Sequence, residues 1–167
     1  YMLELYPDAP LREEMARARL SQAPDDDAAE MYELAMEMVE AAGLAQYEIS
    51  NVSRPGFESK HNLKYWRDGE WFGFGPGAHS TVGGVRWKAV SATEQFVSAI
   101  ESGSDVQTDR RVLSPEDRWQ EALITGLRLV DGVGVDDLLR TYGLDLWARY
   151  GDHLVPYLEA GLLRHEE

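Results

Sequence analysis

The sequence predicts a mixed α/β (α+β) fold in two parts, and three observations support this prediction. A helical pattern over residues 24–43 precedes a strand-like run at 47–52, an order typical of α/β chains. Further short strand-like runs follow. Beyond a polar stretch at 104–113 the pattern becomes helix after helix. We therefore predict a first domain at 1–103, a linker at 104–113 and a helical domain at 114–167.

Local signals place the elements of the first domain. Tyr1–Tyr6 alternates loosely between apolar and polar residues, which predicts a strand. The helix at 24–43 begins with three aspartates at 25–27, and acids at a helix start can cap it and favour the positive end of its dipole. A metal site is the alternative interpretation of these acids. Shorter elements are expected as strands at 71–75 and 85–90 and a helix at 93–102.

The second domain begins with a clear helix start. Ser114 is a typical N-cap residue, and Pro115 suits the first helical position. Two further helices are predicted, one around Leu138 and one over 146–161 that restarts at Pro156. A short strand at 162–165 would complete a unit that resembles a winged helix.

Composition and charge exclude several classes of protein. The 167-residue chain has a formal net charge of −14, which argues against a nucleic-acid binder and against docking on anionic membranes. No apolar run approaches the roughly 18 residues of a spanning helix, so we expect a cytoplasmic location. The chain has no cysteine, which excludes disulfides, thiolate zinc sites and cysteine-ligated iron–sulfur clusters within these residues.

One segment departs from this acidic character. Residues 51–90 carry 3 acidic and 6 basic side chains, whereas residues 1–50 carry 12 and 3, and residues 91–167 carry 15 and 7. The stretch from Tyr47 to Ser80 is also rich in aromatic residues and glycine. A positive, aromatic segment in an acidic protein indicates a site for an anionic ligand with a flat apolar body.

The densest polar and aromatic cluster of this segment consists of His61, Asn62, Tyr65 and Trp66. Imidazole is a common iron ligand and a proximal histidine holds haem in many proteins, so His61 is the candidate haem iron ligand. The aromatic rings could offer flat faces to a porphyrin. Four nearby cations could meet its propionates: Arg54, Lys60, Lys64 and Arg67. The alternative is a histidine hydrogen-bonded in a loop, with the aromatic residues in the core.

Glycines occupy every second position at Gly73, Gly75 and Gly77. Such a run lets the backbone approach a ligand closely, and Ala78 and His79 follow it. A sharp turn that needs glycine for its geometry alone is the alternative. The spacing differs from the G-x-G-x-x-G of dinucleotide-binding folds, which disfavours that class.

Three motifs together resemble a known family. They are YEISN-x-x-RPG from Tyr47, HN-x-x-YW from His61 and W-x-G-x-G-x-GAHS from Trp71. In this order they resemble the C-terminal half of HemW-type haem chaperones, which are related to oxygen-independent coproporphyrinogen III oxidases within the radical S-adenosylmethionine superfamily. The opening LELYPDAPL resembles the last strand region of that family's barrel, and SPEDRWQEALITGLRLVDGV resembles the start of its C-terminal helical domain.

The resemblance implies a fold and a set of site residues. The first domain would be the last part of an incomplete (β/α) barrel, and the exposed sheet edge left by the missing strands would favour a homodimer. The residues expected to bind haem are His61, Asn62, Tyr65 and Trp66. Those expected near the S-adenosylmethionine site are Gly73, Gly75, Gly77, Ala78 and His79.

The resemblance also implies what this chain lacks. The family's C-x-x-x-C-x-x-C motif binds a [4Fe-4S] cluster, whose fourth iron position takes S-adenosylmethionine, and that motif lies upstream of the matched region. The cluster and S-adenosylmethionine are therefore expected in a longer parent protein only, and no catalytic residue is expected here. Ser59 stands where many relatives carry cysteine, and Ala89 stands where the family carries asparagine.

Three functions stay open at this point. The first is a C-terminal fragment of a HemW-like protein that binds haem and delivers it to a receiving protein. In the second, the parent is a true oxygen-independent coproporphyrinogen III oxidase, which removes carboxyl groups by radical chemistry. In the third, the C-terminal helices form a winged DNA-binding regulator, which the negative charge of residues 91–167 disfavours.

Overall fold

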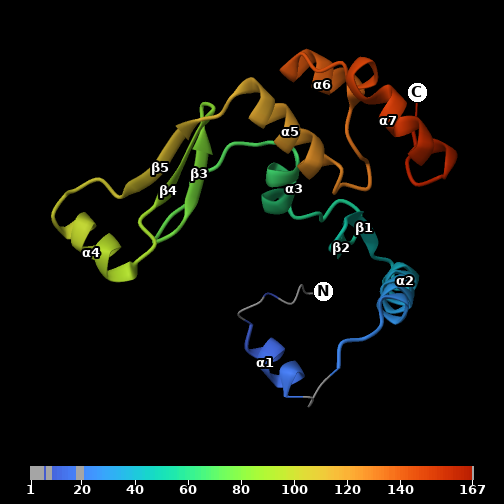
Figure 1. Ribbon diagram of the computed structural model, residues 1–167, viewed down its shortest axis with the longest axis horizontal. Helices are drawn as coiled ribbons and strands as arrows, with labels where there is room; N and C mark the ends of the chain where they lie inside the picture. Colours follow the sequence, from blue (N-terminus) through green and yellow to red (C-terminus); the bar gives the residue numbers. More distant parts are fainter. Residues whose placement is uncertain (1–5, 7–8, 18–20, 167) are drawn as a thin grey trace. The chain divides into compact units, whose positions relative to one another are not determined.

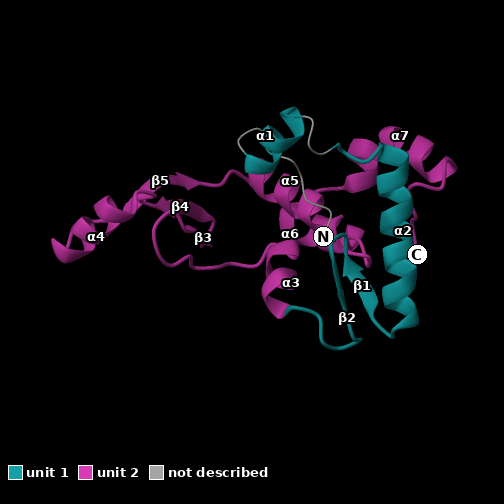
Figure 2. Ribbon diagram, turned by 90° about the horizontal axis from the view of Figure 1, so that it is seen from below, with its two compact units in different colours: residues 1–59 teal, residues 60–167 magenta. Residues whose placement is uncertain are grey.

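The computed structural model of the chain describes residues 6, 9–17 and 21–166, so the strand predicted at Tyr1–Tyr6 lies almost entirely outside the described residues. Figure 1 shows the order of the helices and strands. The chain divides into two compact units, residues 1–59 and residues 60–167 (Figure 2). Helices and small antiparallel sheets occur in it, and the predicted mixed α/β class is confirmed.

The described residues of unit 1 (residues 1–59) form two helices and a β-hairpin. The helices are α1 (Pro10–Ala16) and α2 (Asp25–Ala41), and the strands are β1 (Ala45–Glu48) and β2 (Asn51–Ser53). The helix predicted at 24–43 is confirmed as α2. Its expected aspartate cap is wrong, because the N-cap residue is Pro24 and no side chain caps it. Among the described residues, no group of three or more histidines, aspartates or glutamates is placed to hold a metal ion.

The hairpin replaces the single strand that the sequence predicted at 47–52. β1 pairs antiparallel with β2, with Glu48 opposite Asn51. Glu48 is fully buried, and its carboxylate accepts hydrogen bonds from the Ser50 backbone N–H (3.1 Å) and from the Asn51 side-chain amide. The turn between β1 and β2 is held by this carboxylate. It contains no Asn-Gly or Asp-Gly pair, so the sequence contains no signal for a hairpin.

Unit 2 (residues 60–167) begins with the short helix α3 (Lys60–Trp66) and a three-stranded antiparallel sheet. The sheet has the order β3-β4-β5 and consists of β3 (His79–Val82), β4 (Val85–Ala89) and β5 (Gln107–Val112), with α4 (Thr93–Glu101) between β4 and β5 (Figure 1). β3 and β4 form a hairpin through Gly83 and Gly84, whose φ values of 58° and 72° suit a two-residue loop. The strand predicted at 85–90 and the helix predicted at 93–102 are confirmed.

Two segments of unit 2 differ from the prediction. Residues 104–113, expected to be a linker, contain β5, which pairs antiparallel with β4. The polar sequence of this segment suggested a linker. The segment is instead an exposed strand at the edge of the sheet, where charged residues are common. Residues 71–75 form no continuous strand, and Trp71 makes an isolated bridge to Thr81. The domain boundary itself stays a prediction.

Three helices complete unit 2, as the sequence predicted: α5 (Pro115–Gly126), α6 (Val135–Tyr142) and α7 (Leu146–Glu159). Their buried core consists of Trp119, Leu138, Leu144 and Leu146. Pro156 lies inside α7, so the predicted helix restart is wrong, and residues 162–165 do not form the predicted strand. Within the described part of the chain, no helix is both long enough and apolar enough to cross a membrane.

Candidate functional site

The helix α3 carries the predicted haem-binding cluster and presents it on two faces. Residues four apart lie on the same face of a helix, so His61 is placed with Tyr65, and Asn62 with Trp66. The His61 ring meets the Tyr65 ring nearly edge-on, with 5.0 Å between centroids and 79° between planes. His61 is exposed and Tyr65 is half-buried. This face therefore leaves an imidazole accessible from solvent beside an aromatic ring.

Trp66 lies against the end of α5. The Arg128 guanidinium is 4.4 Å from the centre of the Trp66 ring. The Trp66 carbonyl lies 3.9 Å from the position that a Cβ atom on Gly126 would take, and the Trp66 Nε1 atom is buried without a hydrogen-bond partner. These contacts favour the interpretation in which Trp66 belongs to the core and packs α3 onto α5. Stacking of this ring on a porphyrin stays a prediction.

Trp71 brings the histidine cluster and the glycine segment together, although the sequence suggested no such role for it. Its ring lies 4.9 Å from the Tyr65 ring at 66°. Its indole Nε1–H donates to the His79 carbonyl (3.0 Å), and its backbone pairs with that of Thr81. A continuous line of contacts therefore runs from His61 to the start of β3. The sequence placed Trp71 at the start of the glycine motif but gave no sign of its contact with Tyr65.

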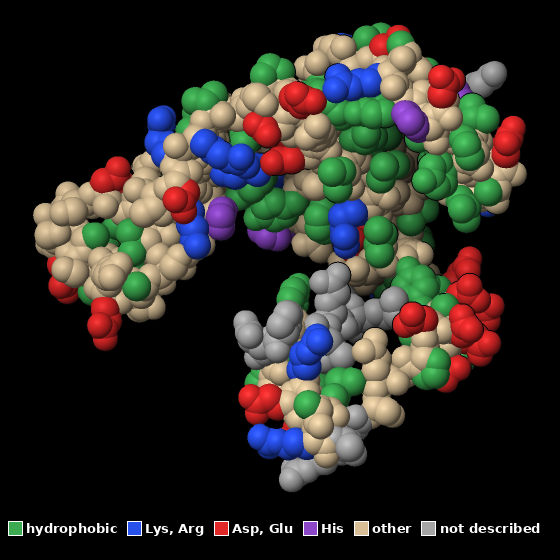
Figure 3. Space-filling view, viewed as in Figure 1, with side chains coloured by type: hydrophobic (Ala, Val, Ile, Leu, Met, Phe, Trp, Pro, Cys, Tyr) green, Lys and Arg blue, Asp and Glu red, His purple; other side chains and the backbone are tan. Residues whose placement is uncertain are grey.

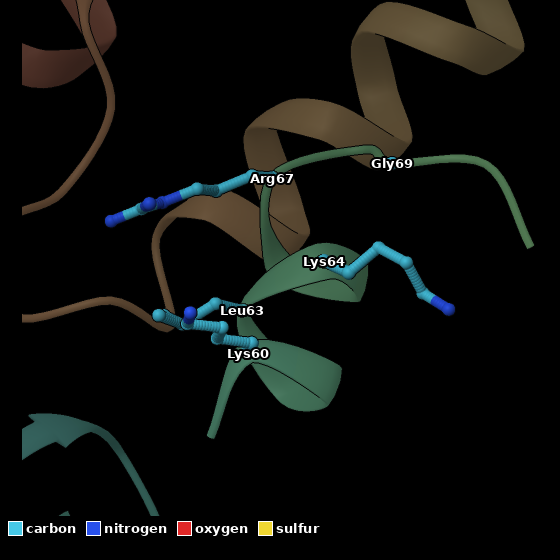
Figure 4. Close-up of a pocket in the computed structure, with 5 residues that line it drawn as sticks. All are labelled: Lys60, Leu63, Lys64, Arg67 and Gly69. Carbon is cyan, nitrogen blue, oxygen red and sulfur yellow. The ribbon is translucent and has the colours of Figure 1, made fainter. Parts of the chain in front are cut away.

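Basic side chains surround a shallow pocket of about 240 Å³ beside α3 (Figure 4). It is lined by Lys60, Leu63, Lys64, Arg67 and Gly69. Figure 4 shows that Lys64 and Arg67 extend away from α3 in opposite directions, so their charges do not converge on one point. Figure 3 shows histidine side chains at the surface next to hydrophobic and basic ones. The fourth predicted propionate contact, Arg54, is exposed and belongs to unit 1.

The glycine segment has a structural reason for each of its three glycines. Gly75 and Gly77 have φ values of 97° and 73°, in the left-handed region that favours glycine. A Cβ atom on Gly73 would lie 2.2 Å from the His79 carbonyl oxygen. The geometry favours the turn interpretation, with Ala78 half-buried and His79 exposed at the start of β3. A cofactor-binding role for these five residues stays a prediction.

Asp68 fixes the chain where it leaves α3. It has a positive φ of 51°, and its carboxylate accepts a hydrogen bond from the Tyr142 hydroxyl (2.6 Å) and lies 3.8 Å from the Arg118 guanidinium. Burial, followed by the hydrogen bond to Asp68, raises the pKa of Tyr142 well above its usual range. The segment after the histidine cluster is thereby tied to both α5 and α6.

Comparison with known sequences finds proteins similar to this chain. Residues 113–167 match the family model of the HemN C-terminal domain. The chain is 35% identical over its full length to "Heme chaperone HemW" of Bacillus subtilis, of which it covers 44%. It is 31% identical to "Heme chaperone HemW" of Lactococcus lactis over 90% of this chain and 39% of that protein. The chain is HemW-like.

A solved structure supports the same relationship at the level of the fold. The HemW-like chain superposes on coproporphyrinogen III oxidase (HemN) from Escherichia coli, a radical SAM enzyme, with a TM-score of 0.68. The match covers 92% of this chain and 39% of that one at 13% sequence identity. The fold is therefore shared, and the HemW-like chain spans less than half the length of the relatives it matches.

Proposed function

We propose that this chain is the haem-handling C-terminal part of a HemW-like radical S-adenosylmethionine protein, with His61 as the haem iron ligand. The observation that supports the proposal most directly is the accessible His61 imidazole, which packs edge-on against Tyr65. Basic side chains line a pocket on the same short helix. Two relatives that match 90% or more of the chain carry the name heme chaperone.

The residues present fit the chemistry of haem. A neutral imidazole is a good ligand for iron, and His61 is exposed on α3. Haem is flat and carries two carboxylates, which Arg and Lys bind well. Lys60 and Arg67 are exposed, and Lys64 is half-buried with its ammonium 4.9 Å from the Tyr65 ring centre. In this proposal Lys60 and Arg67 hold the propionates while Tyr65 supports the imidazole. Lys64 extends from α3 in the direction opposite to Arg67, so its propionate contact stays a prediction.

The remaining predicted contacts take supporting roles in the proposal. Asn62 would add polar contacts to the haem edge, and Trp66 would hold α3 in place through its contact with Arg128. A propionate contact by Arg54 of unit 1 stays a prediction. In the full-length parent, S-adenosylmethionine would approach the segment formed by Gly73, Gly75, Gly77, Ala78 and His79. This chain has no cysteine, so the ligands of a [4Fe-4S] cluster would come from other residues of that parent.

Delivery of haem requires a protein that receives it. We place this exchange in the cytoplasm, where a chaperone can meet its acceptor. We also propose a homodimer formed through an exposed sheet edge. The described edge strand β5 carries Arg110 and Arg111. Charged side chains oppose pairing between two sheet edges. We therefore expect the dimer to form through a sheet edge other than β5. Size-exclusion chromatography with light scattering tests this, and a monomer refutes it.

A haem titration tests the central proposal. Addition of haem to the wild-type chain should shift the Soret band, and His61→Ala should weaken binding by more than the about 10- to 100-fold that loss of an outer-shell partner costs. His79→Ala is the matched control, because His79 is also exposed but starts β3. Absence of a Soret shift in the wild-type chain, or the same shift in His61→Ala, would remove the proposed role.

The fold likeness to HemN favours one second candidate. In it the full-length parent is an oxygen-independent coproporphyrinogen III oxidase, and this chain supplies part of its substrate site. The reconstituted full-length protein should then convert coproporphyrinogen to a vinyl product in the presence of S-adenosylmethionine. A parent that binds haem and forms no vinyl product would leave the chaperone function as the better account.

A further inference from the structure

The Arg86 guanidinium joins three elements of unit 2. It extends from β4, and its Nε–H donates to the Thr81 hydroxyl of β3 (2.9 Å). Its two terminal nitrogens donate to the two carboxylate oxygens of Glu121 on α5, at 2.8 and 2.7 Å. All three nitrogens of the guanidinium therefore donate hydrogen bonds at once. A side chain held in this way has little freedom to rotate.

The ion pair with Glu121 is partly shielded from solvent. The side chains of Arg86 and Glu121 are 20% and 33% exposed, whereas Arg111, which also approaches Glu121, is 56% exposed and remains 3.9 Å away. Two parallel hydrogen bonds give the first pair a defined geometry that the second one lacks. Glu121 therefore acts mainly as the anchor of Arg86.

The fixed guanidinium is in contact with the aromatic residues that lead to His61. Its central carbon lies 5.6 Å from the centre of the Trp71 ring, within the range of a cation–π contact. Trp71 packs against Tyr65 at 4.9 Å, and Tyr65 packs against His61 at 5.0 Å. Each ring limits the orientations open to the next one. A line of contacts thus connects the Arg86 guanidinium to the exposed imidazole through two aromatic rings.

We infer that Arg86 is a positioning residue, which orients the His61 imidazole through Trp71 and Tyr65. Glu121 lies within the segment that matches the HemN C-terminal domain, so this domain contributes to the histidine site through its carboxylate. Where haem is concerned, the inference rests on the proposed function. The positioning itself is a property of the ligand-free chain, and the two can be tested separately.

Nuclear magnetic resonance of the His61 ring protons in the ligand-free, full 167-residue chain tests the positioning. The signals are assigned with His61→Gln, and Tyr65→Leu gives their position when the neighbouring ring current is lost. Arg86→Gln should move the His61 signals toward that position, because Trp71 and Tyr65 lose their fixed support. Glu121→Gln should move them in the same direction, and the double variant should add little. Unchanged His61 signals in a folded Arg86→Gln variant overturn the inference.

Two further variants keep this test decisive. Arg111→Gln is the matched control, because it removes an arginine near the same carboxylate but no planar pair of hydrogen bonds; an equal shift in this variant would contradict the inference. Circular dichroism reports whether each variant is folded. If Arg86→Gln is not folded, Arg86→Lys takes its place, because lysine keeps the charge and lacks the planar guanidinium. For Arg86→Lys we expect the same shift as for Arg86→Gln, and unchanged His61 signals would again overturn the inference.

Haem titration is the second experiment that tests the inference. If the wild-type chain binds haem, Arg86→Gln should weaken binding by about 10- to 100-fold, as loss of an outer-shell partner does, and Arg111→Gln should leave affinity unchanged. Equal haem affinity of wild type and folded Arg86→Gln overturns the inference. A wild-type chain that binds no haem refutes the proposed function instead, while the His61 signals still decide whether Arg86 positions the imidazole.

Discussion

Gly73 shows how closely the glycine segment is packed onto β3. A Cβ atom at this position would lie 2.2 Å from the His79 carbonyl oxygen and 2.9 Å from the Ala78 Cβ atom. The Gly73 N–H donates to the Ser80 hydroxyl (2.9 Å), and the same His79 carbonyl accepts from Trp71. Any side chain at Gly73 would therefore separate Trp71 from β3, and with it the contact that links the glycine segment to the histidine face.

Gly73→Ala should lower the free energy of unfolding by about 1–3 kcal/mol, the usual cost of forcing extra atoms into a packed site. Urea unfolding followed by tryptophan fluorescence measures it. Gly151→Ala is the control, because its Cβ atom would meet only Trp147 at an ordinary 3.8 Å inside α7. This change should raise stability by about 0.5–1 kcal/mol, because glycine is a poor helix former. Equal stability of Gly73→Ala and wild type would contradict the described packing.

The helix α5 is an element whose start the sequence defines fully. The Ser114 hydroxyl accepts from the Asp117 N–H (3.0 Å), and the Asp117 carboxylate accepts from the Ser114 N–H (3.0 Å). The Ser114 hydroxyl also donates to the Asp117 carboxylate (2.8 Å). This hydrogen bond, followed by the one from the Ser114 backbone N–H, holds the pKa of Asp117 below its usual value. A carboxyl group with a lowered pKa stabilises the fold above its unfolded pKa of about 3.9, and this contribution is lost as the pH falls through the lower folded value.

Ser114→Ala should therefore have two effects. At neutral pH it should lower the free energy of unfolding by about 1 kcal/mol, the typical value of an N-cap. Below about pH 4 the difference from wild type should shrink, because the carboxyl group no longer gains from the cap once it is protonated. Urea unfolding at several pH values measures both. Ser91→Ala, at an exposed serine that precedes α4 without capping it, should match wild type throughout, and a constant difference across pH for Ser114→Ala would refute the second effect.

Elements with signals inside a few residues were predictable from the sequence, and those that depend on distant partners were not. α5 begins with serine and proline and was predicted at its true start. The β1–β2 hairpin was predicted as one strand because its turn depends on the buried Glu48 carboxylate. The polar sequence of β5 predicts a linker, whereas the structure shows an exposed strand that pairs with β4. Both wrong predictions, for the hairpin and for β5, concern structure that depends on a side-chain contact or on strand pairing, which hydrophobic periodicity does not reveal.

The candidate site follows the same division. The sequence identified His61 and Tyr65 as members of one polar and aromatic cluster, but it did not show which of the four side chains are exposed. A full helix separates the cluster into an exposed face with His61 and an inner one with Trp66. The pairing of Arg86 with Glu121 spans 35 positions in the chain, so no local pattern could reveal it. The sequence could place these residues in one segment, whereas which of them are exposed and which are packed depends on the fold.

Unit 2 as a whole is held together by contacts between its first helix and its last ones. All five tryptophans lie in residues 60–167, so their fluorescence reports the unfolding of this unit. Asp68 links the end of α3 to α6 through the Tyr142 hydroxyl, and burial together with this hydrogen bond raises the pKa of Tyr142. A tyrosine with a raised pKa stabilises the fold fully below its unfolded pKa of about 10, and the contribution is lost as the pH rises through the folded value.

Tyr142→Phe should lower the free energy of unfolding of unit 2 by about 1 kcal/mol at neutral pH, the usual value of one hydrogen bond. Above about pH 10 the wild type should lose stability more steeply than the variant, because phenylalanine has no proton to release. Urea unfolding followed by tryptophan fluorescence between pH 7 and the alkaline range measures both effects. Tyr157→Phe is the control, because Tyr157 is exposed on α7, and it should follow the wild-type profile. Parallel alkaline profiles of wild type and Tyr142→Phe would show that the bond to Asp68 does not couple α3 to the C-terminal helices.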